Sequence, residues 1–268
     1  MRSSSWAFAA MASLAMASVA AAADLRVVED DAWCREEGWG DGTRHCEVRE
    51  ATLPAGGLLA VDARPNGGVA VQGWDGADVR LRVKIVATAG NEAEARALVG
   101  DVRVDLGETV KAVGPERSEG RRWYASYKLD VPRGARLKLQ ADNGGLSLEQ
   151  FEGDAELHTV NGGLHLDRVG GHVRGETVNG GIHVQLAGTE WRGQGLDLRT
   201  TNGGLHLAIP SGYNARLEAG TVNGGVKSDL PLTTRGHYTG GRIETALGAG
   251  GPVIHVETTN GGLHLQRM

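Results

Sequence analysis

One stretch decides the fold: Thr-Val-Asn-Gly-Gly-Leu-His-Leu at residues 159–166. Its Asn-Gly-Gly core recurs along the chain and is nearly always followed by an apolar, a polar and an apolar residue. The tripeptide begins at Asn66, Asn143, Asn161, Asn179, Asn202, Asn223 and Asn260. We expect seven structural turns, because asparagine tolerates the left-handed backbone conformation and glycine adopts it without a Cβ clash.

The spacing of the turns predicts a repeat architecture. From Asn143 onward the intervals are 18, 18, 23, 21 and 37 residues. We interpret the longest interval as two units, in which the missing turn is replaced near residues 239–241. One unit then consists of two short strands and two glycine turns.

The alternation of side chains along each strand assigns the faces. The first and third residues after each turn are apolar and must point inward: Leu146 and Leu148, Leu164 and Leu166, Ile182 and Val184, Leu205 and Leu207, Leu263 and Leu265. A threonine two residues before the asparagine shares this inward parity, at Thr159, Thr177, Thr200, Thr221 and Thr258. Each of these hydroxyl groups needs a hydrogen-bond partner, which a stack of identical residues capping one another supplies.

Two architectures satisfy this parity: a β-solenoid whose units pair in parallel, and an antiparallel meander with Asn-Gly hairpins. We favour the solenoid, because identical residues at identical places are what in-register parallel stacking produces. The sequence thus predicts an all-β protein, an elongated right-handed β-solenoid or β-helix-like stack of Asn-Gly-Gly repeats. The section before the stack is β-rich and contains one short helix, at residues 91–99.

The N-terminus has the pattern of a secretory signal peptide. Residues 1–23 contain Arg2, an alanine-rich apolar stretch and Ala21-Ala22-Ala23, which predicts cleavage near Ala23 and a periplasmic or extracellular protein. Later in the chain we find no stretch apolar enough for a transmembrane segment. Without Arg2 the chain has 27 basic and 33 acidic residues, which argues against a nucleic-acid partner.

Two cysteines, Cys34 and Cys46, are present, and in an exported chain they predict a disulfide. We expect residues 24–56 to form a disulfide-stapled N-terminal cap, residues 57–141 a β-rich front section and residues 142–268 the repeat stack. The last two are expected to be one continuous unit. The alternative for the disulfide loop, which carries Trp39, is a contact surface.

The motifs together resemble those of the bacterial putative-adhesin β-strand-repeat family, whose fold is called toast-rack. The resemblance is carried by the signal peptide, by Asn66-Gly67-Gly68-Val69 with Gly73-Trp74 and Asp78-Val79 after it, and by Val131-Pro132 leading into the repeats. It implies a β-helix-like envelope protein of unknown function. The family brings no catalytic residues with it. Related toast-rack domains imply, as one alternative, a partner in envelope-stress sensing.

The candidate site residues lie on the outward positions and in the longer units. The position between the two inward apolar residues holds Ser147, His165, His183, His206, Lys227 and His264. His165, His183 and His206 are candidate zinc, copper or nickel ligands, but Lys227 interrupts the column and no carboxylate is in register, so we predict neither metal nor cofactor. Trp191 and Arg192 are candidate ligand contacts on a small sugar-binding shelf, alongside residues 231–238.

The function predicted from the sequence is that of an exported, non-enzymatic β-repeat protein, an envelope structural, adhesion or interaction module. Its partner would be an envelope protein or a polysaccharide surface. The alternative is a carbohydrate-binding or carbohydrate-active β-helix protein that uses the Trp191 region. The acidic residues of the stack show no evident catalytic pair, which disfavours an enzyme.

Overall fold

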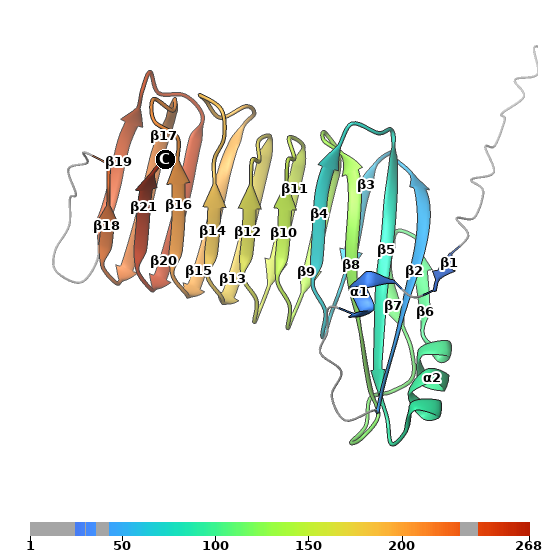
Figure 1. Ribbon diagram of the computed structural model, residues 1–268. Helices are drawn as coiled ribbons and strands as arrows, with labels where there is room; N and C mark the ends of the chain where they lie inside the picture. Colours follow the sequence, from blue (N-terminus) through green and yellow to red (C-terminus); the bar gives the residue numbers. More distant parts are fainter. Residues whose placement is uncertain (1–24, 30, 36–42, 231–240) are drawn as a thin grey trace, which may run out of the picture.

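Two β-sheets face each other and together form an elongated stack (Figure 1). The computed structural model describes residues 25–29, 31–35, 43–230 and 241–268. One sheet has eleven strands in the order β1-β2-β5-β8-β4-β10-β12-β14-β16-β21-β18, and the other has ten in the order β19-β17-β20-β15-β13-β11-β9-β3-β7-β6. In the described part of the chain, no helix is long and apolar enough to cross a membrane.

The repeat region is a parallel β-solenoid, as the sequence predicted. The strands that follow the turns lie in the eleven-stranded sheet: β10 (Leu146–Glu149), β12 (Leu164–Asp167), β14 (Ile182–Gln185), β16 (Leu205–Ile209), β21 (Leu263–Arg267) and β18 (Val226–Ser228). The strands that precede them lie in the ten-stranded sheet: β9 (Arg136–Ala141), β11 (Asp154–Thr159), β13 (His172–Asn179), β15 (Gly195–Asn202), β20 (Val253–Asn260) and β17 (Ala215–Asn223). These neighbours pair in parallel and in register, for example Leu146 with Leu164. The antiparallel meander is therefore wrong.

The residues before the repeat region continue both sheets. They supply β1 (Arg26–Val28), β2 (Arg44–Pro54), β5 (Asp78–Thr88), β8 (Arg122–Pro132) and β4 (Val69–Trp74) to one sheet, and β3 (Leu58–Asp62), β7 (Thr109–Val113) and β6 (Arg103–Leu106) to the other. Strands β4 and β3 pair in parallel with β10 and β9, so the stack grows directly on this section.

In the described residues, two helices accompany the sheets. The expected helix is α2 (Glu92–Asp101), whose first turn is capped by Asn91, which accepts a hydrogen bond from the Glu94 N–H at 2.9 Å. The other, α1 (Ala32–Arg35), is a single turn at the N-terminal side of the disulfide.

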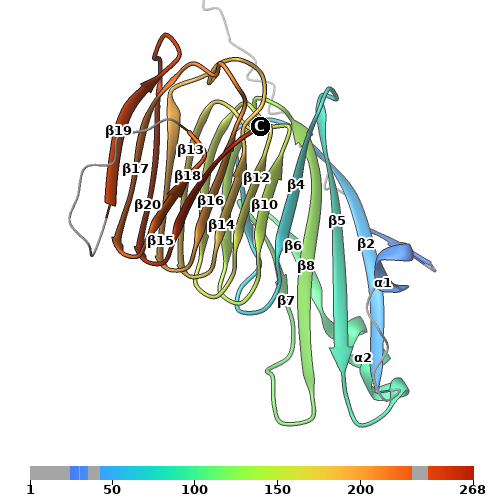
Figure 2. The same ribbon diagram turned by 60° about the vertical axis from the view of Figure 1, so that its left-hand side comes forward.

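The inward apolar positions form the core, as the parity argument predicted. Leu146, Leu164, Ile182, Leu205 and Leu263 are each at most 2% exposed. The turned view in Figure 2 shows the repeated units stacked behind one another.

The order of the last two units in space differs from their order in sequence. Strand β21 pairs with β16 on one side and with β18 on the other, and β20 likewise lies between β15 and β17. The unit of Asn260 is thus inserted between those of Asn202 and Asn223. Before it, β19 (Gly241–Leu247) runs antiparallel to β17 and forms the edge of its sheet. Our interpretation of the 37-residue interval as two consecutive units overlooked this; residues 239 and 240 lie outside the described part.

Two polar ladders hold the turns together. Each asparagine amide donates to the side-chain oxygen of the neighbouring asparagine at 2.8–3.0 Å, from Asn143 to Asn66 and onward through every unit. Each buried threonine hydroxyl donates to the first glycine carbonyl of the neighbouring turn at 2.7–2.9 Å. The partner of the threonine is therefore a backbone carbonyl in the neighbouring unit and not another threonine.

The turn glycines are needed for a different reason from the one we expected. Apart from Gly67, with φ of 154°, none of them is among the described residues with positive φ. Instead, a Cβ on the first glycine of a stacked turn would lie 2.0–2.1 Å from the carbonyl oxygen of the first glycine in the adjacent unit, as at Gly162, Gly180 and Gly203. The backbones of successive turns approach too closely for any side chain.

Removal of one threonine hydroxyl tests the second ladder. Thr200 is 4% exposed, and its hydroxyl donates to the Gly180 carbonyl at 2.8 Å. We expect Thr200→Val to lower the free energy of unfolding by about 1–2 kcal/mol, because the carbonyl loses its side-chain donor in a buried place. The matched control is Thr201→Val, at the next, exposed position. Equal urea midpoints for the two variants would show that the hydroxyl contributes nothing.

Candidate functional site

The histidine row, defined as His165, His183, His206 and His264, is an uninterrupted line on the outer face of the eleven-stranded sheet. Strand pairing places these residues directly opposite one another on β12, β14, β16 and β21. The prediction that Lys227 interrupts the column is wrong, because the insertion of β21 moves Lys227 to the end of the row, beside His264. Four imidazoles in succession are thus produced by the order of units.

The side chains of the row are close to one another. Ring centroids are 5.9 Å apart between His183 and His206 and 4.9 Å apart between His206 and His264. The Nε2–H of His206 donates to the Gln266 side-chain oxygen at 2.9 Å. Nε2 of His264 is buried and has no hydrogen-bond partner among the described residues. Burial, together with the charges of His206 and His165, holds the pKa of His183 below its usual value.

A shallow trough of about 430 Å³ lies at the front end of the row. Its lining includes the small residues Gly68, Ala70 and Ser147, together with Trp33, His165 and His183. Strand pairing continues the line of the row from Ser147 through Ala70 to Lys128. The trough therefore extends the histidine row toward the front section.

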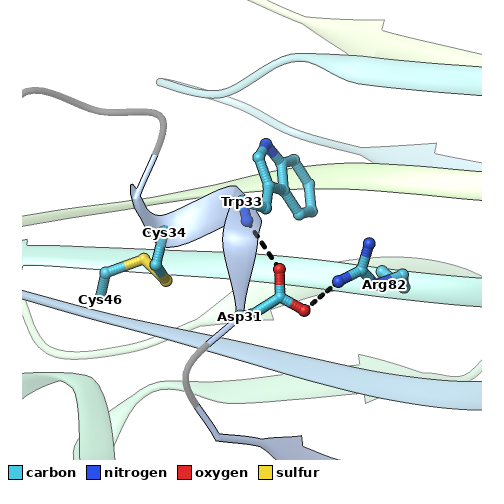
Figure 3. Close-up of a disulfide and its surroundings, with 5 residues drawn as sticks. All are labelled: Asp31, Trp33, Cys34, Cys46 and Arg82. Atoms are coloured by element: carbon cyan, nitrogen blue, oxygen red, sulfur yellow. Dashed lines mark hydrogen bonds and ion pairs between the residues drawn. A yellow bond between two sulfur atoms is a disulfide. The ribbon is translucent and has the colours of Figure 1, made fainter.

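The N-terminal helix α1 supplies the Trp33 wall and brings cations with it. The ammonium nitrogens of Lys84 and Lys128 lie 4.9 and 4.4 Å from the Trp33 ring centroid. As Figure 3 shows, the backbone N–H of Trp33 donates to the Asp31 carboxylate at 2.8 Å, and the same carboxylate pairs with Arg82. Partial burial raises the pKa of Asp31, but these two contacts outweigh it, so the pKa lies below its usual value.

The disulfide fastens this helix to the sheet. Cys34 at the end of α1 is bonded to Cys46 in β2, with 5.8 Å between the Cα atoms, as predicted (Figure 3). Residues 36–42, which include Trp39, lie outside the described part of the chain, so the alternative of a contact surface there stays a prediction. The basic residues near Trp33 were missed in the sequence, although Arg80, Arg82 and Lys84 alternate along β5 and so share one face.

The outer face of the ten-stranded sheet has a different character, because its charges pair with one another. Arg199 contacts Asp197, Arg216 contacts Glu218, and Arg242 contacts Glu244, at 3.0–3.2 Å. His255 lies among three carboxylates, with nitrogen–oxygen distances of 3.7 Å to Glu218, 3.7 Å to Glu257 and 4.0 Å to Asp197. These exposed pairs contribute little stability, but they leave that face locally neutralised.

The Trp191 side chain lies in the core. It is 3% exposed, and its indole N–H donates to the Gly171 carbonyl at 3.1 Å. The structure therefore does not place this indole on an exposed shelf, and a ligand contact there stays a prediction. Arg192 does point to solvent, where it pairs with Glu152. Residues 231–238, the other part of the expected shelf, fall in the segment that is not described.

A metal site on the histidine row would need several side chains that converge on one ion. In the described ranges, no three His, Cys, Asp or Glu side chains are arranged to hold a metal ion. His165, His183 and His206 are brought into one line, as the sequence predicted, but as a ladder along the sheet. Their geometry is better suited to an extended ligand that contacts each rung in turn.

Solved structures that are similar to this chain include the crystal structure of a putative cell adhesion protein from Clostridium sporogenes ATCC 15579. The match covers 84% of this chain and 100% of that protein's chain, with a TM-score of 0.41 and 9% sequence identity. No family model matches the sequence, and no curated protein matches it.

Proposed function

We propose that this protein is an exported, non-enzymatic interaction module that binds an extended envelope partner along the outer face of its eleven-stranded sheet. The observation that carries the proposal is the difference between the two outer faces. On one face the arginines of β15, β17 and β19 each pair with a carboxylate of their own strand, whereas the other face presents the histidine row, with Lys227 at its end. Groups that are not neutralised by their own strand are the ones available to a partner.

The rigidity of the stack suits this role. Two ladders tie every unit to the next, so the spacing of the row is set before a partner arrives. A preorganised surface loses little conformational entropy on binding, and repeated weak contacts along it add up.

Export is supported by the disulfide and by the predicted signal peptide. Disulfides persist in oxidising compartments outside the cytoplasm. Cleavage near Ala23 falls outside the described residues and stays a prediction. The division into cap, front section and stack also stays a prediction. So does the alternative role in envelope-stress sensing. The carbohydrate alternative that uses the Trp191 region also stays a prediction, and the burial of the Trp191 indole gives it no support.

The two faces can be compared directly by obstructing one at a time. We expect Ser147→Trp, on β10, to weaken cosedimentation with isolated envelope material by about tenfold, the size of effect seen when a hot spot is lost. The matched control is Glu156→Trp, at an exposed outward position of β11 in the other sheet. Absence of cosedimentation for the unmodified protein would contradict the proposed function. Equal loss in both variants would contradict the choice of face.

A further inference from the structure

The histidine row has the geometry of a linear charge array. It places one imidazole on each of four consecutive strands, which are about 4.8 Å apart in a sheet, and the pairing continues into Lys227. At the opposite end lie the trough and then Lys128 and Lys84. A fully protonated row would therefore form a straight line of positive charges with permanent cations at both ends.

The neighbouring outward row decides which part of this line an anion would approach most easily. On this face its members are Asp130, Gln72, Glu149, Asp167, Gln185, Ala208, Gln266 and Asp229. Its carboxylates belong to Asp130 on β8, Glu149 on β10, Asp167 on β12 and Asp229 directly after β18. The Asp167 carboxylate pairs with Arg168 at 2.8 Å. Beside His183, His206 and His264 the neighbours are Gln185, Ala208 and Gln266. The half of the row nearest Lys227 is thus flanked mainly by uncharged residues.

The charge of this array depends on pH. An ordinary histidine changes charge near pH 6.5. The pKa of His183 is lowered, first by burial and then by the charges of His206 and His165. Mild acid, or an anion bound along the row, favours the charged form of an imidazole.

We propose that the histidine row binds a linear acidic polysaccharide, and that the affinity rises as the solution becomes mildly acidic. This inference rests on the proposed function, because it names the partner and the regulation of the same face. A polysaccharide fits better than a flat lipid surface, since the charges form a single line. It also fits better than a metal ion, because the described side chains provide no set of three ligands.

Immobilised dextran sulfate, with uncharged dextran as the blank, is a suitable probe. We expect the full-length mature protein to bind dextran sulfate about tenfold more tightly at about pH 5.5 than at about pH 7.5. His206→Gln with His264→Gln should remove most of this difference. The matched control is His158→Gln with His172→Gln on the other sheet, which removes the same number of titratable groups and should keep it.

A gain-of-function variant distinguishes the loss of binding groups from simple misfolding. His206→Lys with His264→Lys makes the charges permanent, so it should bind at about pH 7.5 nearly as tightly as the unmodified protein does at about pH 5.5. Failure of this variant to bind would overturn the inference. So would an unchanged pH response in the glutamine variant, a requirement for added zinc that a chelator abolishes, or binding to anionic vesicles without binding to dextran sulfate.

Failure of the inference and failure of the proposed function give different results. Suppose that the protein cosediments with envelope material, that Ser147→Trp weakens this cosedimentation, and that the protein does not bind dextran sulfate. Then only the polysaccharide and the pH dependence are wrong. If it binds neither, the face is not a binding surface.

Discussion

Gly203→Ala is expected to destabilise the protein by about 3 kcal/mol, the upper part of the range for overpacked sites. A Cβ at this position would lie 2.0 Å from the Gly180 carbonyl oxygen in the adjacent unit. The obstructing atom is a backbone carbonyl oxygen that also accepts the Thr200 hydroxyl hydrogen bond, so it cannot move aside without disturbing the contact between two rungs. Urea unfolding followed by circular dichroism would measure the loss.

The adjacent glycine provides the control for this prediction. A Cβ on Gly204 would have its nearest contact at 3.7 Å, an ordinary van der Waals distance. We therefore expect Gly204→Ala to change the free energy of unfolding by less than about 0.5 kcal/mol. Similar large losses in both variants would mean that the turns need glycine for its backbone conformation, as the sequence alone had suggested, and that close stacking is not the cause.

Trp191→Ala is expected to cost about 3–5 kcal/mol of stability, as is typical for a large buried aromatic residue. The substitution empties a site that is 3% exposed and removes the hydrogen bond to the Gly171 carbonyl. Thermal and urea unfolding would both report the change. A lower denaturation midpoint with an unchanged slope would indicate lost native-state packing.

Arg192→Ala serves as the comparison, because the Arg192 side chain is 72% exposed and makes an ion pair at the surface. We expect this change to cost less than about 1 kcal/mol. If Trp191→Ala left stability intact and abolished polysaccharide binding, the indole would be a ligand contact after all, contrary to its position in the core.

Residue patterns along single strands predicted much of the architecture. The alternation around Leu164 and Leu166 assigned the buried face, and recurrence of identical residues selected parallel stacking over a meander. Cys34 and Cys46 were paired correctly, and the helix near Asn91 was found. These features depend on local periodicity or on residue type, both of which can be read without knowing which segments meet.

The errors concerned contacts between distant segments. Trp191 looked like a surface residue because it lies in an irregular stretch between strands, and only its packing against Gly171 shows that it is buried. The turn glycines were explained by backbone conformation, whereas the cause is the distance between turns of adjacent units. The role of Trp33 depends on α1 lying over β5 and β8, which no local pattern indicates.

By itself, the sequence determined what a single unit is: a threonine and apolar side chains inward, a polar residue outward, and an Asn-Gly-Gly turn between two strands. Only the tertiary structure decided the order in which the units stack. The units of Asn202, Asn223 and Asn260 present nearly the same threonine, asparagine and glycine groups to a neighbour, so each can pair with any other in the same register. In the structure the last unit lies between the other two, with β19 antiparallel on β17, and this order brings His264 against His206.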